Sequence, residues 1–134
     1  MLMPKKSKYR KSHKGGRGGK ASRMNAVSFG DYGLRALEAI WMSSRQLEAG
    51  RRVITRFVKK GGRIWIRPFP HKPVTSKSGE VPMGKGKGAV DHYVTVIKPG
   101  MIIYEMSGIT EAQAKEALEA AAHKLPIKCQ FVVK

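Results

Sequence analysis

Two amphipathic helices are the clearest elements that the hydrophobic pattern predicts. Between Ser43 and Lys60 the apolar residues recur at helical spacing, and an advance of about 100° per residue places them on one face. The residues of this face are Leu47, Gly50, Ile54, Phe57 and Val58. Ser43 and Gln46 fit a capping box at the start of the helix, and Gly61-Gly62 is expected to end it.

The second helix is predicted from Thr110 to about Lys124, and Thr110 forms a capping box with Gln113. Its predicted buried face consists of Ala114, Leu118, Ala121, Ala122 and Leu125. Glu111 and Lys115 stand four residues apart, which favours an ion pair on the outer surface. Because its outer residues carry mixed charge, we interpret this helix as scaffold.

Strands are predicted where apolar residues alternate with polar ones or where β-branched and aromatic residues gather. Residues 63–67 alternate basic and apolar side chains around Trp65, the pattern of a strand with one face in water. Residues 92–97 and 101–106 flank the turn sequence Lys98-Pro99-Gly100, which predicts a β-hairpin.

The two ends of the folded part also read as strands. Residues 127–133 predict a closing strand. Residues 25–40 give mixed signals, and we interpret them as a strand with a bulge near Gly30 or Gly33.

The stretch from Pro68 to Gly88 has neither a helical nor a strand period. Its prolines, which are expected to block regular pairing, are Pro68, Pro70, Pro73 and Pro82. Its lysines Lys72, Lys77, Lys85 and Lys87 face a single acid, Glu80. A loop of this length inside a compact domain is usually functional or disordered. We interpret it as a basic finger that reaches into an RNA cavity.

These elements predict an α+β fold, a mostly antiparallel sheet with two packed helices, a long basic loop and a basic N-terminal arm. We expect the arm at residues 1–23 and one RNA-binding domain at 24–134, with the extended loop at 68–90. The chain contains no internal repeats.

Charge narrows the function more than any other property of the composition. Lys and Arg number 27 against 9 Asp and Glu, which gives a formal net charge of +18 in 134 residues. Such self-repulsion indicates a polyanionic partner, and nucleic acid is favoured over a merely solvated surface. The chain contains no long apolar run that would indicate membrane insertion.

Basic residues in three places are the candidates for contacts with RNA. The arm supplies Lys5, Lys6, Lys8, Arg10, Lys11, Lys14 and Arg17, the first helix Arg45, Arg52, Arg56 and Lys59, and the strand after it Arg63 and Arg67. A disordered solubilising tail and a simply wet helix face are the alternatives. Against the second, the helix has one acid, Glu48, which we expect to lie off to the side of its basic face.

No catalytic or metal-binding pattern is recognisable. Gly79 through Lys85 resembles a phosphate-binding loop, but Gly86 stands where Ser or Thr must hold magnesium and a strand is predicted to follow. Cys129 is the single cysteine, so a disulfide framework is excluded, and no metal-ligand spacing appears. Trp65, Phe69 and Tyr9 are candidates for stacking on bases, although aromatic residues in strands are more often part of the core. An enzyme and a cofactor are not expected.

Several segments together resemble one known family. They are PKKSKYRKSHKG, SRQLEAGRRVITRFVKKGGRIWIRPFPHKPVT, MGKGKG, VIKPGMIIYEMSGIT and AAHKLPIKCQFV. In order and spacing the chain resembles bacterial-type large-subunit ribosomal protein L-sixteen over nearly its full length. Because the resemblance begins at Leu2, we expect the arm to belong to the mature protein and not to a transit peptide.

The resemblance implies a structural component of the large ribosomal subunit. Such a protein binds large-subunit rRNA near the peptidyl-transferase centre and contacts tRNA in the aminoacyl, possibly the peptidyl, site. The residues nearest tRNA would be Lys72, Lys77, Met83, Gly84, Lys85, Gly86, Lys87 and Gly88. Pro82 departs from the basic residue that family members usually carry before Met-Gly-Lys-Gly-Lys-Gly, which puts that contact in doubt.

The implied partners are rRNA, tRNA and neighbouring ribosomal proteins, with no membrane and no DNA. The expected location is the cytoplasmic ribosome of a bacterium, and an organellar ribosome is the alternative. A general nucleic-acid-binding protein is the alternative function.

Overall fold

The computed structural model describes residues 3–4, 24–58, 62–70, 72–76 and 89–134. Its elements in chain order are β1 (Tyr32–Ala36), β2 (Ile40–Ser43), α1 (Ser44–Phe57), β3 (Arg63–Ile66), β4 (Lys72–Ser76), β5 (Ala89–Ile97), β6 (Ile102–Ser107), α2 (Glu111–Ala122) and β7 (Cys129–Val133). The predicted α+β class is confirmed, since two helices accompany strands that all pair antiparallel.

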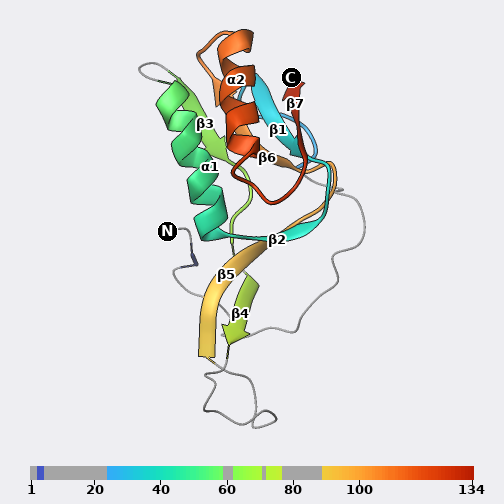
Figure 1. Cartoon of the computed structure of the whole chain (residues 1–134). Coiled ribbons are helices and arrows are strands. Elements are labelled where there is room, and N and C mark those ends of the chain that lie inside the picture. The colour runs from blue at the N-terminus through green and yellow to red at the C-terminus, as the bar shows by residue number, and fades with distance from the viewer. Residues whose placement is uncertain (1–2, 5–23, 59–61, 71, 77–88) are drawn as a thin grey trace.

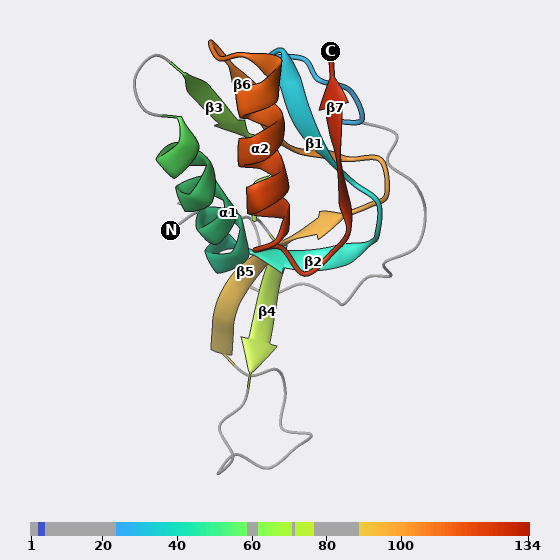
Figure 2. The same cartoon turned by 45° about the horizontal axis from the view of Figure 1, so that its top comes forward.

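The strands form two sheets. One has four strands in the order β3-β6-β1-β7, and α1 and α2 lie side by side across one face of it (Figures 1 and 2). The other has three strands in the order β2-β5-β4. Figure 1 shows β4 and the start of β5 projecting away from the body that carries the helices. The molecule is therefore a two-layer body with a narrow antiparallel extension.

Both predicted capping boxes are present. In α1 the Ser43 side chain accepts a hydrogen bond from the Gln46 backbone N–H, and the Gln46 side chain accepts one from the Ser43 backbone N–H. Thr110 and Gln113 form the same pair of hydrogen bonds at the start of α2. Each box satisfies two backbone groups that the first turn of a helix leaves unpaired.

The end of α1 differs from the prediction. The helix stops at Phe57, with Val58 extended as its C-cap, so it ends before Gly61-Gly62. This change of conformation keeps the Val58 side chain buried, whereas Phe57, predicted for the buried face, is 42% exposed. The remaining members of that face, Leu47, Gly50 and Ile54, are buried as predicted.

Residues 25–40 do not form one strand. They contribute β1 to the larger sheet and the start of β2 to the smaller one. The irregularity in β1 pairing falls between Leu34 and Arg35, directly after Gly33, so the bulge predicted near this glycine is confirmed. Gly30 also allows a close approach, because a Cβ there would lie 2.5 Å from the carbonyl oxygen of Met106.

The predicted hairpin of residues 92–106 is also wrong, since β5 and β6 belong to different sheets. The turn itself exists: the Met101 N–H donates to the Lys98 oxygen at 3.1 Å, and Gly100 has φ of 95°. The Gly100 N–H then donates to the oxygen of Ala36 at 2.8 Å. The proline–glycine sequence thus turns the chain from one sheet into the other.

The stretch after Pro68 contains a strand that the prolines were expected to forbid. In β4, Pro73 pairs with Tyr93 of β5. The strand lies at the edge of its sheet, where only one row of backbone groups must pair and proline is tolerated. β5 is longer than predicted and β7 two residues shorter, beginning at Cys129. Residues 77–88 lie outside the described part of the chain.

A tight contact joins α1 to the sheet. The buried Tyr104 hydroxyl of β6 donates to the backbone oxygen of Leu47 at 2.6 Å. It passes Gly50, where a Cβ would overlap the hydroxyl and lie 2.9 Å from Cζ of the ring. Burial also raises the pKa of this phenol far above its ordinary value, so it stays a donor.

Gly50→Ala is predicted to destabilise the protein although alanine is the better helix former. Propensity alone would add about 1 kcal/mol of stability. Overlap with Tyr104 should cost more, and we expect a net loss of about 1–3 kcal/mol in urea unfolding. In a Tyr104→Phe background the loss should shrink, because the overlapping oxygen is gone. A gain in stability from Gly50→Ala alone would contradict this packing.

Candidate RNA-binding surface

The outer face of α1 carries arginines in the predicted arrangement. Arg45, Arg52 and Arg56 are all exposed, on the side of the helix away from its buried residues. Lys59, the fourth predicted member, lies outside the described residues. A row of guanidinium groups on a rigid helix suits the phosphate groups of a nucleic acid.

Glu48 is more closely tied to this face than expected. It accepts hydrogen bonds from Arg51, one of them from Nε at 2.9 Å, and lies 3.6 Å from Nε of Arg52. The hydrogen bond from Arg51 and the two positive charges lower the pKa of Glu48. Arg51 was not among the predicted residues, although its spacing of three from Glu48 could have indicated the pair. Within the described residues Glu48 forms ion pairs with Arg51 and Arg52 and not with Arg45 or Arg56, so the face stays positive.

Glu105 of β6 is the centre of the opposite side of the sheet. Because Tyr104 points to α1, the next residue along the strand points to the face that carries no helix. The carboxylate is fully buried, and its Oε1 accepts from the backbone N–H groups of Ser28 at 2.9 Å, Phe29 at 2.7 Å and Gly30 at 2.9 Å. Its Oε2 accepts from Nη1 of Arg67.

The pKa of Glu105 records the balance of these contacts. Loss of hydration on burial acts to raise the pKa and is the largest single effect. The hydrogen bonds from Gly30 and Phe29 and the ion pair with Arg67 outweigh it together, and the net pKa is lowered. The carboxylate is therefore charged at neutral pH in spite of its burial.

Arg67 has a different place from the other predicted RNA contacts. Its side chain is only 13% exposed, pairs with Glu105 and lies with Cζ 4.8 Å from the centroid of the Phe29 ring. The structure thus uses this guanidinium to hold residues 26–30 against the sheet. Arg63, at the start of β3, is exposed and stays available for phosphate.

Trp65 is partly covered and does not stand free for stacking on a base. Its ring stacks with that of Phe29, with centroids 6.3 Å apart and planes at 24°. Phe29 itself is 61% exposed and Phe69 is 45% exposed. Sequence reasoning chose Trp65 and missed Phe29, since only the tertiary contact shows which ring lies outermost.

Lys72 lies at the base of the projection, at the start of β4. Its Nζ sits 4.3 Å from the centroid of the Trp41 ring in β2, so the two outer strands of the small sheet are joined across β5. The indole N–H of Trp41 is buried and has no hydrogen-bond partner among the described residues. The other predicted tRNA-proximal residues, Lys77 and 83–88, and all those of the arm, lie outside the described residues.

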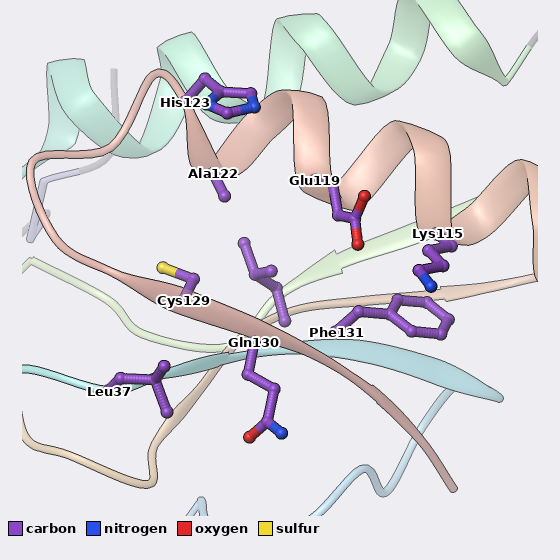
Figure 3. A pocket seen from close by; sticks show the side chains of 9 residues that line it. Leu37, Lys115, Glu119, Ala122, His123, Cys129, Gln130 and Phe131 are labelled. Atoms are coloured by element: carbon purple, nitrogen blue, oxygen red, sulfur yellow. The ribbon is translucent and has the colours of Figure 1, made fainter.

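A hollow of about 650 Å³ lies between α2 and β7 (Figure 3), and it has a different character. Its lining residues are Leu34, Leu37, Lys115, Glu119, Ala122, His123, Cys129, Gln130 and Phe131. Burial, and then the charge of Glu38, raises the pKa of the Cys129 thiol to about 11, so it is protonated at neutral pH. Within the described residues no cluster of His, Cys, Asp and Glu could hold a metal ion. The hollow offers neither a nucleophile nor a cation site.

The family model of ribosomal protein L16p/L10e matches residues 4–132. The chain belongs to this family. It is 52% identical to the large ribosomal subunit protein uL16c of Gracilaria tenuistipitata over 134 residues, which is 100% of this chain and 99% of that protein. It is also 52% identical to the protein of the same name from Porphyra purpurea, across 100% of this chain and 96% of that one.

Membership of the family makes the chain a structural component of the large ribosomal subunit and not an enzyme. As a ribosomal protein it has rRNA and other ribosomal proteins as partners, and it takes part in translation. No helix that the structure describes is long and apolar enough to cross a membrane.

Glu105→Gln is predicted to destabilise the fold strongly and to weaken its acid sensitivity. The amide can still accept from the backbone, but it leaves Arg67 without a counter-charge, and we expect a loss of about 3 kcal/mol near pH 7. In the wild type, the folded pKa of Glu105 lies below its ordinary value of 4.5. The stabilisation is therefore complete above that value and is lost as pH falls through the folded pKa.

Urea unfolding between pH 7 and pH 3 checks both statements. The wild type should lose more stability over this range than Glu105→Gln does. Glu116→Gln, at an exposed position of α2, removes one carboxylate as a control and should behave like the wild type. Equal acid sensitivity of wild type and Glu105→Gln would contradict the role of the buried carboxylate.

Proposed function

We propose that this protein binds large-subunit rRNA near the peptidyl-transferase centre and brings its long loop to tRNA in the aminoacyl site. The observation that carries the proposal is the exposed arginine face of α1, formed by Arg45, Arg52 and Arg56 on a chain of net charge +18. The family shows the ribosomal role, and these residues are the described surface that best suits an RNA backbone.

The rRNA contacts are proposed for the arm, the arginine face and Arg63. Helix α1 is fixed by its capping box and by the Tyr104 contact, so the backbone that carries these arginines is held in place before RNA arrives. Such preorganisation reduces the ordering cost of binding. Arg67 is left out of the proposed rRNA contacts, because its charge is paired with Glu105 within the fold.

The tRNA contact is proposed for the end of the β4–β5 projection. The projection extends from the lower end of the body in Figure 1. The contact between Lys72 and the Trp41 ring stabilises its base. Residues 77–88 connect the far ends of its two strands. Lys85 and Lys87 there supply positive charge among glycines, which let the backbone approach a phosphate closely.

The location is proposed to be a plastid ribosome. The relatives from Gracilaria tenuistipitata and Porphyra purpurea are named uL16c, the name of a chloroplast ribosomal protein. This favours the organellar alternative over the bacterial cytoplasm that was first expected.

Replacing Arg45, Arg52 and Arg56 together by Ala tests the rRNA surface. We expect weaker binding to large-subunit rRNA and a flatter dependence of the affinity on salt, with the slope of log K against log salt reduced by about 0.7–0.9 per lost phosphate contact. The matched control replaces Lys115, Lys124 and Lys128, which are exposed on the side of α2 and β7. It removes the same charge and should retain most of the slope.

An equal loss of rRNA affinity in both variants would mean that net charge, and not the arginine face of α1, determines the binding. Duplex DNA serves as the competitor in the same titration. If the wild type binds duplex DNA as well as rRNA, the arginine face binds nucleic acid without specificity, and its proposed contact with rRNA is wrong.

Lys85→Ala combined with Lys87→Ala tests the tRNA contact separately. Ribosomes that contain this variant should bind aminoacyl-site tRNA several-fold more weakly, because two charges near the tRNA backbone are lost. Incorporation of the protein into large subunits, measured by gradient sedimentation, should stay normal. Unchanged tRNA affinity with normal incorporation would remove tRNA from the proposal and leave the rRNA contacts standing.

A further inference from the structure

Phe29 is the most exposed large apolar side chain in the described residues, at 61%. It precedes β1, within the segment that crosses the helix-free face of the four-stranded sheet. Scattered exposed apolar residues are common on proteins and need no explanation. Phe29 differs from them because the ring and its backbone are both held in place.

The ring contacts two side chains of the neighbouring strand. Trp65 and Arg67 are two residues apart, so their side chains project from the same face of the extended chain. The Phe29 ring lies against both, with its centroid 6.3 Å from that of Trp65 and 4.8 Å from Cζ of Arg67. Because 61% of the Phe29 side chain is still exposed, these two contacts leave a large part of the ring uncovered.

The backbone of Phe29 is fixed by the buried carboxylate. Its N–H and those of both neighbours donate to the same oxygen of Glu105, at 2.7–2.9 Å. An aromatic ring held this way gives up little further conformational freedom when a partner covers it. This combination of exposure and rigidity is characteristic of residues that dominate the affinity of an interface.

We propose that the outer face of Phe29 stacks on an unpaired nucleobase of the large-subunit rRNA. The inference rests on the proposed function and assigns one kind of contact to one residue. The surrounding charge favours RNA over a protein surface: Arg63 is exposed on the same strand as Trp65, and Nζ of Lys134 donates to the oxygen of Ser28 at 3.4 Å.

The exposed cations Arg63 and Lys134 outnumber the one exposed acid near the ring, Asp31. Glu105 is buried and paired with Arg67, and Asp31 is the only acid between residues 24 and 36. Every nucleobase has a face that stacks on an aromatic ring, so the contact requires no particular base sequence. Trp65 then acts beneath Phe29 as its support, which explains why the larger ring is the more covered one.

Variants of the full-length chain at position 29 test the stacking. With large-subunit rRNA, Phe29→Ala should weaken binding by about 5- to 150-fold, the range that one lost base stack gives. Phe29→Leu should lose most of the same affinity because it keeps apolar bulk without a π-face, and Phe29→Tyr should bind like the wild type. The salt slope should not change, since no charge is removed.

Leu37→Ala is the matched control, because Leu37 is also exposed, at 48%, and borders the hollow beside α2. It should bind rRNA like the wild type. Thermal unfolding of each variant separates lost contacts from lost folding, and Phe29→Leu, which keeps an apolar side chain at this exposed position, should unfold close to the wild type.

A photoreactive benzoylphenylalanine at position 29 in assembled ribosomes identifies what covers the ring. An adduct with rRNA supports the proposal, and an adduct with a ribosomal protein overturns it. If Phe29→Leu and Phe29→Ala bind rRNA as the wild type does, the stacking is wrong while the arginine surface stands. If the wild type shows no preference for rRNA over duplex DNA, the proposed function itself is wrong.

Discussion

The buried carboxylate of Glu105 is the interaction on which one whole side of this protein depends. It stands on the second strand of the four-stranded sheet and is bound by three backbone N–H groups and by Arg67. Each charge-assisted hydrogen bond of this kind contributes about 1.5–3 kcal/mol. Together they offset the loss of hydration and attach the segment 24–31 to the face of the sheet that the helices leave open. Gly33 makes the fit possible, since a Cβ there would lie 2.8 Å from Cγ2 of Val27.

The two faces of the four-stranded sheet are consequently covered in different ways. Helices α1 and α2 bury the apolar core on one face, with α1 presenting its arginines outward. On the other face, a short irregular segment is ordered by one charge and presents Phe29. Arginine illustrates the division. Arg67 is held by a carboxylate within its reach and stabilises the fold, whereas Arg63, four residues earlier, is exposed. Residue type alone does not separate these roles.

The second sheet explains how a small domain extends a loop beyond its own core. Only part of it packs under the helices, at β2 and at the end of β5 that carries Ile97, whereas β4 and the start of β5 continue outward as an antiparallel ladder (Figure 1). An isolated two-stranded ribbon is marginally stable in water. Here β2 adds a third strand at its base, and the Lys72 ammonium over Trp41 connects the outer two. In the proposed function this geometry positions the loop at residues 77–88 while the body binds rRNA.

Sequence alone determined what depends on neighbouring residues or on totals. The sequence predicted both helices with their capping boxes, and the turn at Lys98–Met101, because each depends on a few neighbouring residues. It also predicted the polyanion partner, from the net charge, and the family, from short matching segments. Tertiary structure alone decided which strands pair. The sequence of residues 92–106 predicts a strand, a turn and a second strand. The structure pairs β5 with β2 and β4, whereas β6 pairs with β1 and β3 in the other sheet.

The same distinction holds for the candidate site. The exposed arginines of α1 followed from helical periodicity, whereas the pairing of Arg67 with Glu105 spans 38 positions and that of Gly30 with Glu105 spans 75. No local pattern encodes such contacts, because they result from competition among all the partners that the folded chain brings together. Composition therefore predicted a nucleic-acid partner, and only the fold decided which cations remain free to bind it and which aromatic ring lies at the surface.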